Sequence, residues 1–288
     1  MSRAPFSQSD LSFAVGPKFQ TVWGLREAAV FTLEGVGVSA FLGFALTGQI
    51  VGMACALAAV IVAVFLLLSH LGKPMVAWRA IVNVRRSWIS RGTVAIGLFC
   101  VLGALYIAGS TTPVLVPVEG IQTPLLYMVA LVGLFILLYP GLAMAASAGV
   151  AFWTTPLLPI LSLLQGVASG FFVVLATVDS EAMASLTSQL PQIGFGLIAA
   201  LAIFMIVYAV VMLRRGGAAA LSSTYLVRKN PLAFWALSVG LGLALPCIVL
   251  LADIQWGLIV TIAAIGRLVG DVAFRYTILK VGSFESVI

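Results

Sequence analysis

Eight long apolar stretches, separated by short segments with polar residues, Gly and Pro, make up most of the chain. A helix needs roughly 20 apolar residues to cross about 30 Å of hydrocarbon, and each stretch has about that length. We therefore predict transmembrane helices over 24–47, 50–70, 93–110, 123–145, 156–178, 192–213, 231–252 and 256–280. The predicted fold is an all-α polytopic membrane protein, with its helices packed as two four-helix bundles. Residues 1–288 contain no linker or soluble segment, so we expect a single integral membrane domain.

The boundary between the fourth and fifth helices is the least marked, because only small residues with Phe152, Trp153 and Pro156 indicate a turn. One long helix over 142–178 would reduce the number of spans to seven and place the termini on opposite sides. The distribution of charge favours eight. With eight spans, all basic residues outside the helix interiors fall on one side, whereas the opposite loops carry only acidic residues. The basic residues are Arg3, Lys18, Arg26, Lys73, Arg79, Arg85, Arg86, Arg91, Arg214, Arg215, Arg228, Lys229 and Lys280. The acidic residues are Glu119, Asp179, Glu181 and Asp253.

The composition agrees with a membrane protein. Hydrophobic residues make up 62% of the chain and charged residues 8%, against about 25% charged residues in soluble domains. The formal charge of +6 does not indicate nucleic-acid binding, because the basic residues flank the spans and set orientation. By the positive-inside rule, the basic loops and both termini are predicted to face the cytoplasm, in a bacterial or archaeal cytoplasmic membrane.

Conventional cofactor ligands are scarce in this sequence. There is one histidine, so the chain alone cannot supply two histidine ligands to a haem. Cys55, Cys100 and Cys247 lie singly in apolar segments and lack the spacing of a metal or cluster site. We predict that this chain holds no haem, metal ion or iron–sulfur cluster of its own.

Four charged residues lie inside predicted spans, where an unpaired charge is costly and often functional. Arg267, Asp271 and Arg275 are spaced four apart in the last helix and share one face. Glu34 lies about ten residues from the basic end of the first helix, roughly 15 Å deep. These residues could form an ion-pair lock between the first and last helices. Alternatively, they form a proton-transfer path or the polar wall of a ligand pocket.

His70 ends the second predicted helix on the basic side, and Tyr139 and Arg275 reach a similar shallow depth. A histidine, a tyrosine and an arginine in an apolar bundle suit a quinone, whose carbonyl oxygens need hydrogen-bond donors and whose reduction needs protons. His70 has a simpler explanation, as an interfacial residue that bonds a carbonyl or a lipid headgroup.

The segment after His70 combines cations with tryptophans, namely Lys73, Trp78, Arg79, Arg85, Arg86, Trp88 and Arg91. Tryptophans near the membrane interface, which here include Trp23 and Trp153, are usually lipid anchors. A loop with five cations is also suited to docking a soluble protein, since Arg and Trp are frequent anchors of interfaces.

Several motifs together resemble one family over most of the chain. They are 34–37 (EGVG), 70–74 (HLGKP), 78–80 (WRA), 87–91 (SWISR), 139–141 (YPG), 152–159 (FWTTPLLP) and 275–279 (RYTIL) with Gly282. In this order they resemble the membrane-anchor subunits of the polysulfide reductase/NrfD family and the related dimethyl sulfoxide reductase anchors.

The resemblance implies a concrete function. Such anchors bind an iron–sulfur subunit, which in turn joins a molybdopterin or tungstopterin catalytic subunit. They exchange electrons with menaquinone or ubiquinone near the closest cluster, in oxidoreductase complexes of anaerobic respiration. The resemblance places His70, Tyr139 and the 73–91 segment on the partner-facing side, with quinone held by His70, Tyr139 and Arg275. A rival interpretation is a secondary transporter or proton-coupled channel that uses Glu34, Arg267, Asp271 and Arg275, although no inverted repeat supports it.

Overall fold

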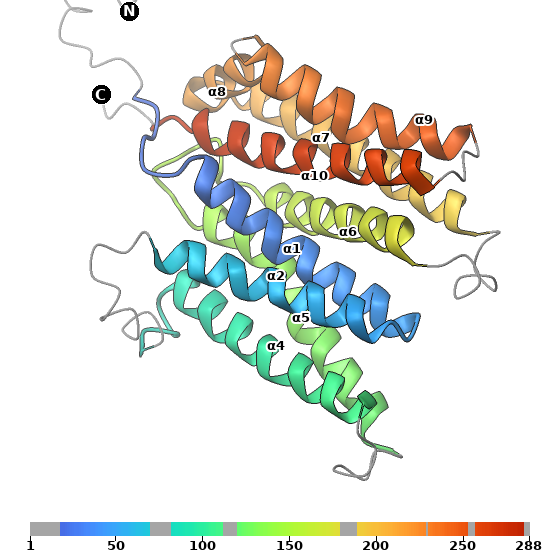
Figure 1. The fold of residues 1–288 in the computed structure, drawn as a ribbon. Coiled ribbons are helices and arrows are strands. Elements are labelled where there is room, and N and C mark those ends of the chain that lie inside the picture. Colours follow the sequence, from blue (N-terminus) through green and yellow to red (C-terminus); the bar gives the residue numbers. More distant parts are fainter. Residues whose placement is uncertain are drawn as a thin grey trace, which may run out of the picture.

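The computed structural model describes residues 18–69, 82–111, 120–178, 189–228, 230–252 and 257–284, and these residues are almost entirely helical (Figure 1). The predicted all-α fold with eight membrane spans is confirmed. The spans are α1 (Leu25–Leu46), α2 (Ile50–Leu68), α4 (Trp88–Thr111), α5 (Gln122–Ala145), α6 (Leu157–Thr177), α7 (Leu190–Arg215), Leu232–Leu251 and α10 (Gly257–Lys280). Because α5 ends at Ala145 and α6 begins at Leu157, the seven-helix alternative is wrong.

Three features of the helices differ from the predicted pattern. Helix α4 begins five residues before the predicted start at 93, so Trp88 and Arg91 lie in its first turn. A short helix, α8 (Gly217–Arg228), follows α7 and is not long enough to span a membrane. The seventh span is two helices in sequence, the π-helix η3 (Leu232–Ala244) and α9 (Leu245–Leu251).

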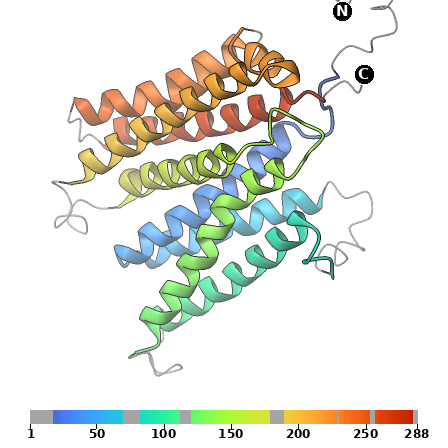
Figure 2. The same ribbon diagram turned by 180° about the vertical axis from the view of Figure 1, so that it is seen from behind.

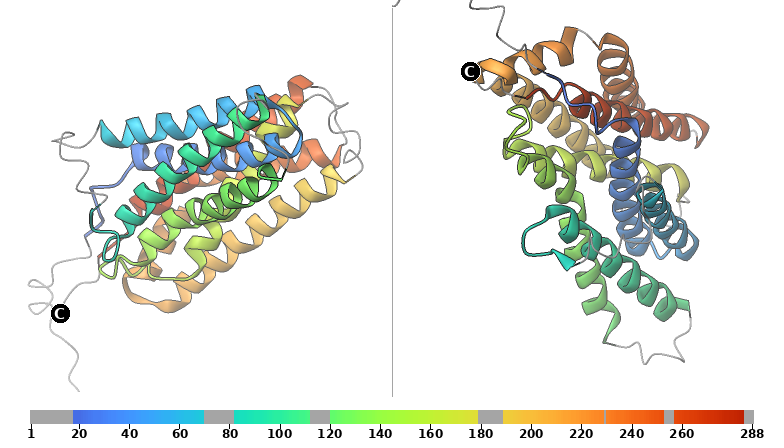
Figure 3. Two further views of the ribbon diagram at one scale, coloured as in Figure 1. Left: turned by 90° about the horizontal axis from the view of Figure 1, so that it is seen from below. Right: turned by 90° about the vertical axis from the view of Figure 1, so that its left-hand side faces the viewer.

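Successive spans run in opposite directions, which gathers one set of helix ends at the left of Figure 1. We call this side the basic end: α1, α4, α6 and η3 begin there, and α2, α5, α7 and α10 finish there. Its described cations are Lys18, Arg26, Arg85, Arg86, Arg91, Arg214, Arg215, Arg228 and Lys280. The right-hand view of Figure 3 faces this end, where α8, the 146–156 connection and the start of α4 are visible.

The buried hydrophobic residues divide into two main cores. One is built mostly from α1, α2, α4 and α5, and includes Phe41, Phe99 and Ile136. The other is built mostly from α6 to α10 and includes Phe172 and Tyr208. These two groups correspond to the predicted pair of four-helix bundles. Helix α5 lies behind α1 in Figure 1 and crosses in front of it when the molecule is seen from behind (Figure 2).

The bundles meet through unusually close backbone contacts between α1 and α6. A Cβ atom added to Gly35 would lie 3.1 Å from the Gly166 Cα, and one added to Gly43 would lie 2.7 Å from a Val174 methyl. Between these two contacts, Gly170 lies directly against Ser39. Residues four apart share a helix face, so α1 and α6 cross along a stripe of small residues, as is common between membrane helices.

The last turn of α10 is capped from outside the helix. The Trp153 indole N–H donates to the Ile278 carbonyl oxygen (3.0 Å), and the Gln20 side-chain amide donates to the Leu279 carbonyl oxygen (2.5 Å). Trp153 also stacks on Trp23, with ring centroids 5.5 Å apart. Trp153 is only 5% exposed, so its interpretation as a lipid anchor was wrong: it satisfies a carbonyl that the end of the helix would otherwise leave unpaired.

Candidate functional site

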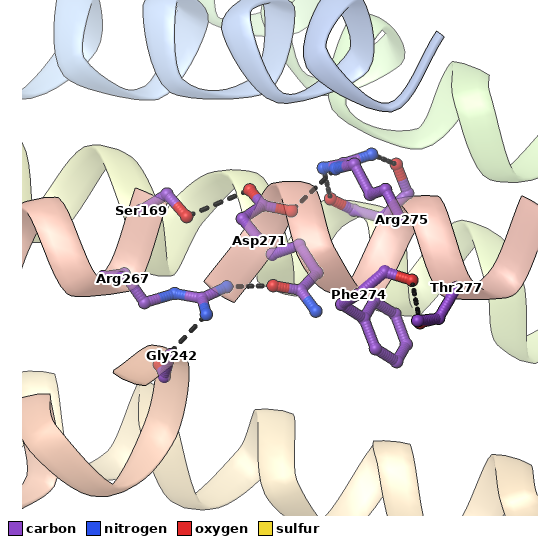
Figure 4. Close-up of polar contacts among 9 residues, drawn as sticks. Ser169, Gly242, Arg267, Asp271, Phe274, Arg275 and Thr277 are labelled. Atoms are coloured by element: carbon purple, nitrogen blue, oxygen red, sulfur yellow. Dashed lines mark hydrogen bonds and ion pairs between the residues drawn. The ribbon is translucent and has the colours of Figure 1, made fainter. Parts of the chain in front are cut away.

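A buried ion pair lies where α10 packs against α6 (Figure 4). The Arg275 Nε donates to Asp271 Oδ1 at 2.7 Å, and the Ser169 hydroxyl donates to the other carboxylate oxygen at 3.0 Å. Asp271 is fully buried and Arg275 is 5% exposed. Both carboxylate oxygens therefore have a donor, and the carboxylate is fixed in place between two helices.

The Arg275 guanidinium also bonds to α6 and extends toward α1. Its Nη1 donates to the Ser162 hydroxyl (3.2 Å) and its Nη2 to the Ser162 carbonyl (3.4 Å). A Cβ atom at Gly35 would lie 3.4 Å from Nη2, so the absence of a side chain there lets the guanidinium approach α1. Arginine has five N–H donors. Three are used in these bonds, and within the described part of the chain two remain for another acceptor such as a ligand carbonyl.

Glu34 lies near both this ion pair and Tyr139. Glu34 is 1% exposed, and its carboxyl interacts electrostatically with the Arg275 guanidinium and the Tyr139 hydroxyl. Tyr139 packs edge-to-face on Phe31 of α1, with ring centroids 6.3 Å apart, and its ring lies against Gly92 of α4. The structure thus brings together Glu34, Tyr139 and Arg275 from three helices.

Arg267 makes a second set of contacts one turn deeper along α10. Its guanidinium donates to the Gly242 carbonyl (3.0 Å) and to the Gln165 side-chain oxygen. The Gly242 carbonyl is accessible partly because Pro246, four residues later, has no N–H to donate to it. Gly242 and Gly270 pack backbone against backbone, which holds η3 close enough to α10 for this bond.

Several buried polar atoms of this region have no hydrogen-bond partner among the described residues. They are Glu34 Oε2, Gln165 Nε2 and Arg267 Nε, together with the hydroxyls of Thr32 and Ser39. Most buried polar groups in proteins are hydrogen-bonded, so these unpaired donors and acceptors distinguish the region from ordinary apolar packing.

The predicted site residues fall into three groups. Tyr139, Arg275, Glu34 and Asp271 lie around the buried ion pair, and Arg267 lies beside them on the same face of α10. His70, Lys73, Trp78 and Arg79 lie outside the described residues. Arg85, Arg86, Trp88 and Arg91 lie at the basic end.

The described part of the predicted docking loop has a more ordered structure than expected. The Arg91 guanidinium donates to the carbonyls of Val84 and Arg85, both at 2.9 Å. It also lies over the Trp88 ring, 4.4 Å from its centroid. The prediction of one continuous loop over 73–91 was wrong at the C-terminal end of that loop, because Trp88 and Arg91 are helical. Arg91 holds the preceding turn against α4.

Ser162, Gln165 and Ser169 were missed from the sequence. All three are on α6, are buried, and bond Arg275, Arg267 and Asp271, respectively. Their spacing of three and four residues places them on one helical face, and this polar face in an apolar span was the signal that could have identified them. Among the described residues, no group of three or more His, Cys, Asp and Glu side chains is arranged to hold a metal ion.

These features define an integral membrane protein with eight spans and a buried ionic site where α6 and α10 meet α1. The family model described as "Polysulphide reductase, NrfD" matches residues 36–285, and the chain belongs to this family. A search of curated proteins gave no match. Family membership identifies the chain as a membrane subunit of polysulfide-reductase-type complexes.

Proposed function

We propose that this protein is the quinone-reactive membrane anchor of a molybdopterin and iron–sulfur oxidoreductase complex. It passes electrons between the quinone pool and an iron–sulfur subunit, through which it joins the catalytic subunit. The observation that carries the proposal, beyond family membership, is the buried group of Tyr139, Arg275 and Glu34. It combines hydrogen-bond donors with a proton-exchanging carboxyl within an apolar bundle.

The residues fit a quinone of either common type, menaquinone or ubiquinone. Arg275 has two N–H donors left for a carbonyl oxygen, while Asp271 and Ser162 hold its guanidinium in one orientation. The Tyr139 hydroxyl is a second donor on the neighbouring bundle. A bound quinone supplies two-electron, two-proton redox chemistry, and these side chains bind and orient it.

The position along the helices supports access from one side. Arg275 lies five residues before the end of α10 and Tyr139 six before the end of α5, which is roughly 8–9 Å from the basic end at 1.5 Å per residue. We propose that His70 completes the site and that the iron–sulfur subunit docks over 73–91. The cations at the end of α7 and on α8 form a second basic patch within 214–230. By the positive-inside rule this face is cytoplasmic.

The decisive experiment is quinone-analogue binding and quinol-linked electron transfer in the purified complex. We expect Tyr139→Phe to weaken binding by about 2- to 10-fold, since a hydrogen bond contributes about 0.5–1.5 kcal/mol. Arg275→Met and His70→Ala should lower turnover. Tyr127→Phe is the matched control, because Tyr127 is on the same helix but 72% exposed.

The alternatives predict different results. If an iron–sulfur protein copurifies and all three site variants keep normal turnover, the quinone site lies elsewhere in the anchor. If no iron–sulfur protein copurifies and no quinone analogue binds, the proposal is wrong, and a transporter that uses Glu34, Arg267, Asp271 and Arg275 becomes the better explanation.

A further inference from the structure

The two buried carboxyls near Arg275 have different surroundings. Asp271 receives hydrogen bonds on both oxygens, from Arg275 and from Ser169. Glu34 is equally buried, but its Oε2 has no partner among the described residues. A buried carboxylate oxygen without a donor is unfavourable by several kcal/mol, so Glu34 needs either a proton or a water molecule, whereas Asp271 needs neither.

Two of the unpartnered atoms belong to residues that flank one helix crossing. Glu34 directly precedes Gly35, and Gln165 directly precedes Gly166. These two glycines pack backbone against backbone where α1 crosses α6. The Gln165 side-chain oxygen is taken by Arg267, so the Gln165 amide N–H groups face elsewhere and lack an acceptor. Among the described residues, those that flank the crossing therefore carry one unsatisfied donor group and one unsatisfied acceptor.

This donor and acceptor pattern suits water. A buried water typically makes about three hydrogen bonds to otherwise unsatisfied polar groups. The Gln165 amide would donate to such a water, and the water would donate to Glu34 Oε2. The unpartnered Ser39 hydroxyl, one turn beyond Gly35 on the same α1 face, extends the polar region along the crossing.

We propose that the α1–α6–α10 crossing binds water next to Glu34, that Glu34 is the proton-exchanging group of the site, and that Asp271 is a fixed counter-ion for Arg275. The role of Glu34 in turnover rests on the proposed quinone function. Reduction of one quinone to quinol takes two electrons, from the iron–sulfur partner, and two protons. Glu34 gives up its proton, its carboxylate is stabilised by Arg275, and it is reprotonated through the bound water before the second transfer.

Other charged groups close to Glu34 fit this assignment. Arg275 approaches it from α10 and Tyr139 from α5, whereas the described part of α2 and helix α6 carry no Asp, Glu, Lys, Arg or His. Arg275 is bound mainly by Asp271. Its charge therefore favours the ionised form of Glu34, but it does not form a permanent ion pair with the Glu34 carboxylate. A carboxyl beside a cation that already has its own partner is able to exchange a proton in both directions.

The test is infrared spectroscopy of the purified protein at neutral pH, without quinone. We expect a carbonyl stretch of a buried carboxylic acid that disappears in Glu34→Gln, returns at a shifted position in Glu34→Asp, and is unchanged in Glu27→Gln. Glu27 is the control on the same helix, where its carboxylate caps the Gly24 N–H at 2.6 Å. On transfer to D₂O the band should shift promptly, because water reaches the group.

Three results would overturn the inference. The band could persist in Glu34→Gln and be lost only when Asp271→Asn is added, which would make Asp271 the proton carrier. The band could be missing from the wild-type protein, although the Glu34→Asp variant folds normally. It could also fail to shift in D₂O, which would exclude the water. None of these measurements depends on quinone. A failure of quinol-linked turnover would therefore contradict the proposed function, but the assignment of Glu34 as the proton-exchanging group would still be decided by the infrared experiment.

Discussion

The Asp271–Arg275 ion pair gives the sharpest stability prediction. The two charged atoms are 2.7 Å apart, so at an effective dielectric constant of about 20 their attraction is roughly 6 kcal/mol. Removing both ions from water costs several kcal/mol each. The attraction and the desolvation costs are comparable in size, so the pair as a whole should contribute little net stability.

Breaking the pair should be much worse than replacing it. Asp271→Leu leaves the buried Arg275 with only the Ser162 oxygens, and removing one partner of a buried pair costs about 3–5 kcal/mol. Arg275→Met leaves Asp271 with only Ser169 and should have a similar cost. The double variant Asp271→Leu/Arg275→Met removes both charges, and such replacements are often neutral or stabilising by about 1–4 kcal/mol.

The assay is equilibrium unfolding of the four proteins in mixed detergent micelles, analysed as a double-mutant cycle. The double variant should be more stable than either single variant. If the two losses simply add, Asp271 and Arg275 do not depend on each other for stability, and the reasoning from a desolvated pair is refuted. A similar cycle with Ser169→Ala should show a smaller coupling to Asp271, because a neutral donor contributes less than an ion.

The remaining predictions concern packing and capping. Gly170→Leu should destabilise the fold by about 1–3 kcal/mol or more, since the new side chain meets the α1 backbone. Gly97→Leu should have little effect, because Gly97 faces open space on α4. Thermal unfolding of the two variants tests this, and equal losses of stability would contradict the close crossing. Trp153→Phe should cost about 1–3 kcal/mol because it leaves the buried Ile278 carbonyl unpaired. Trp235→Phe should cost less, since Trp235 is 50% exposed and its partner can bond elsewhere, so a larger loss at 235 would contradict this account.

The spans could be predicted from sequence because the requirement for an apolar helix of fixed length dominates in a membrane. Most boundaries agree within two residues. The exception is the start of α4, where Arg91 lowered the apolar character of the first turn although the helix already begins at Trp88. The short helix α8 was missed for a different reason: its small residues are buried against neighbouring helices at the basic end and carry no membrane-length apolar signal.

The site was predictable only in part. Charged residues inside a span are conspicuous, so Glu34, Arg267, Asp271 and Arg275 could be identified from sequence. Their partners could not, because partner choice depends on how helices cross. Spacing alone placed Arg267 one turn from Asp271, but the hydrogen bonds of Arg267 go to α6 and η3 instead. Nothing in the apolar pattern indicated the π-helical η3.

The small residues and the buried charges of this protein depend on each other. A guanidinium reaches a neighbouring helix only where the backbones approach closely, and Gly35 and Gly242 provide that approach for Arg275 and Arg267, respectively. In return, hydrogen bonds between helices supply attraction that apolar side chains do not, because lipid is as apolar as the helix surface. The Asp271 side of the site is saturated with such bonds, and the Glu34 side is not. This difference places the rigid part of the site at α6 and α10 and leaves the exchangeable proton on α1, in the bundle that carries Tyr139.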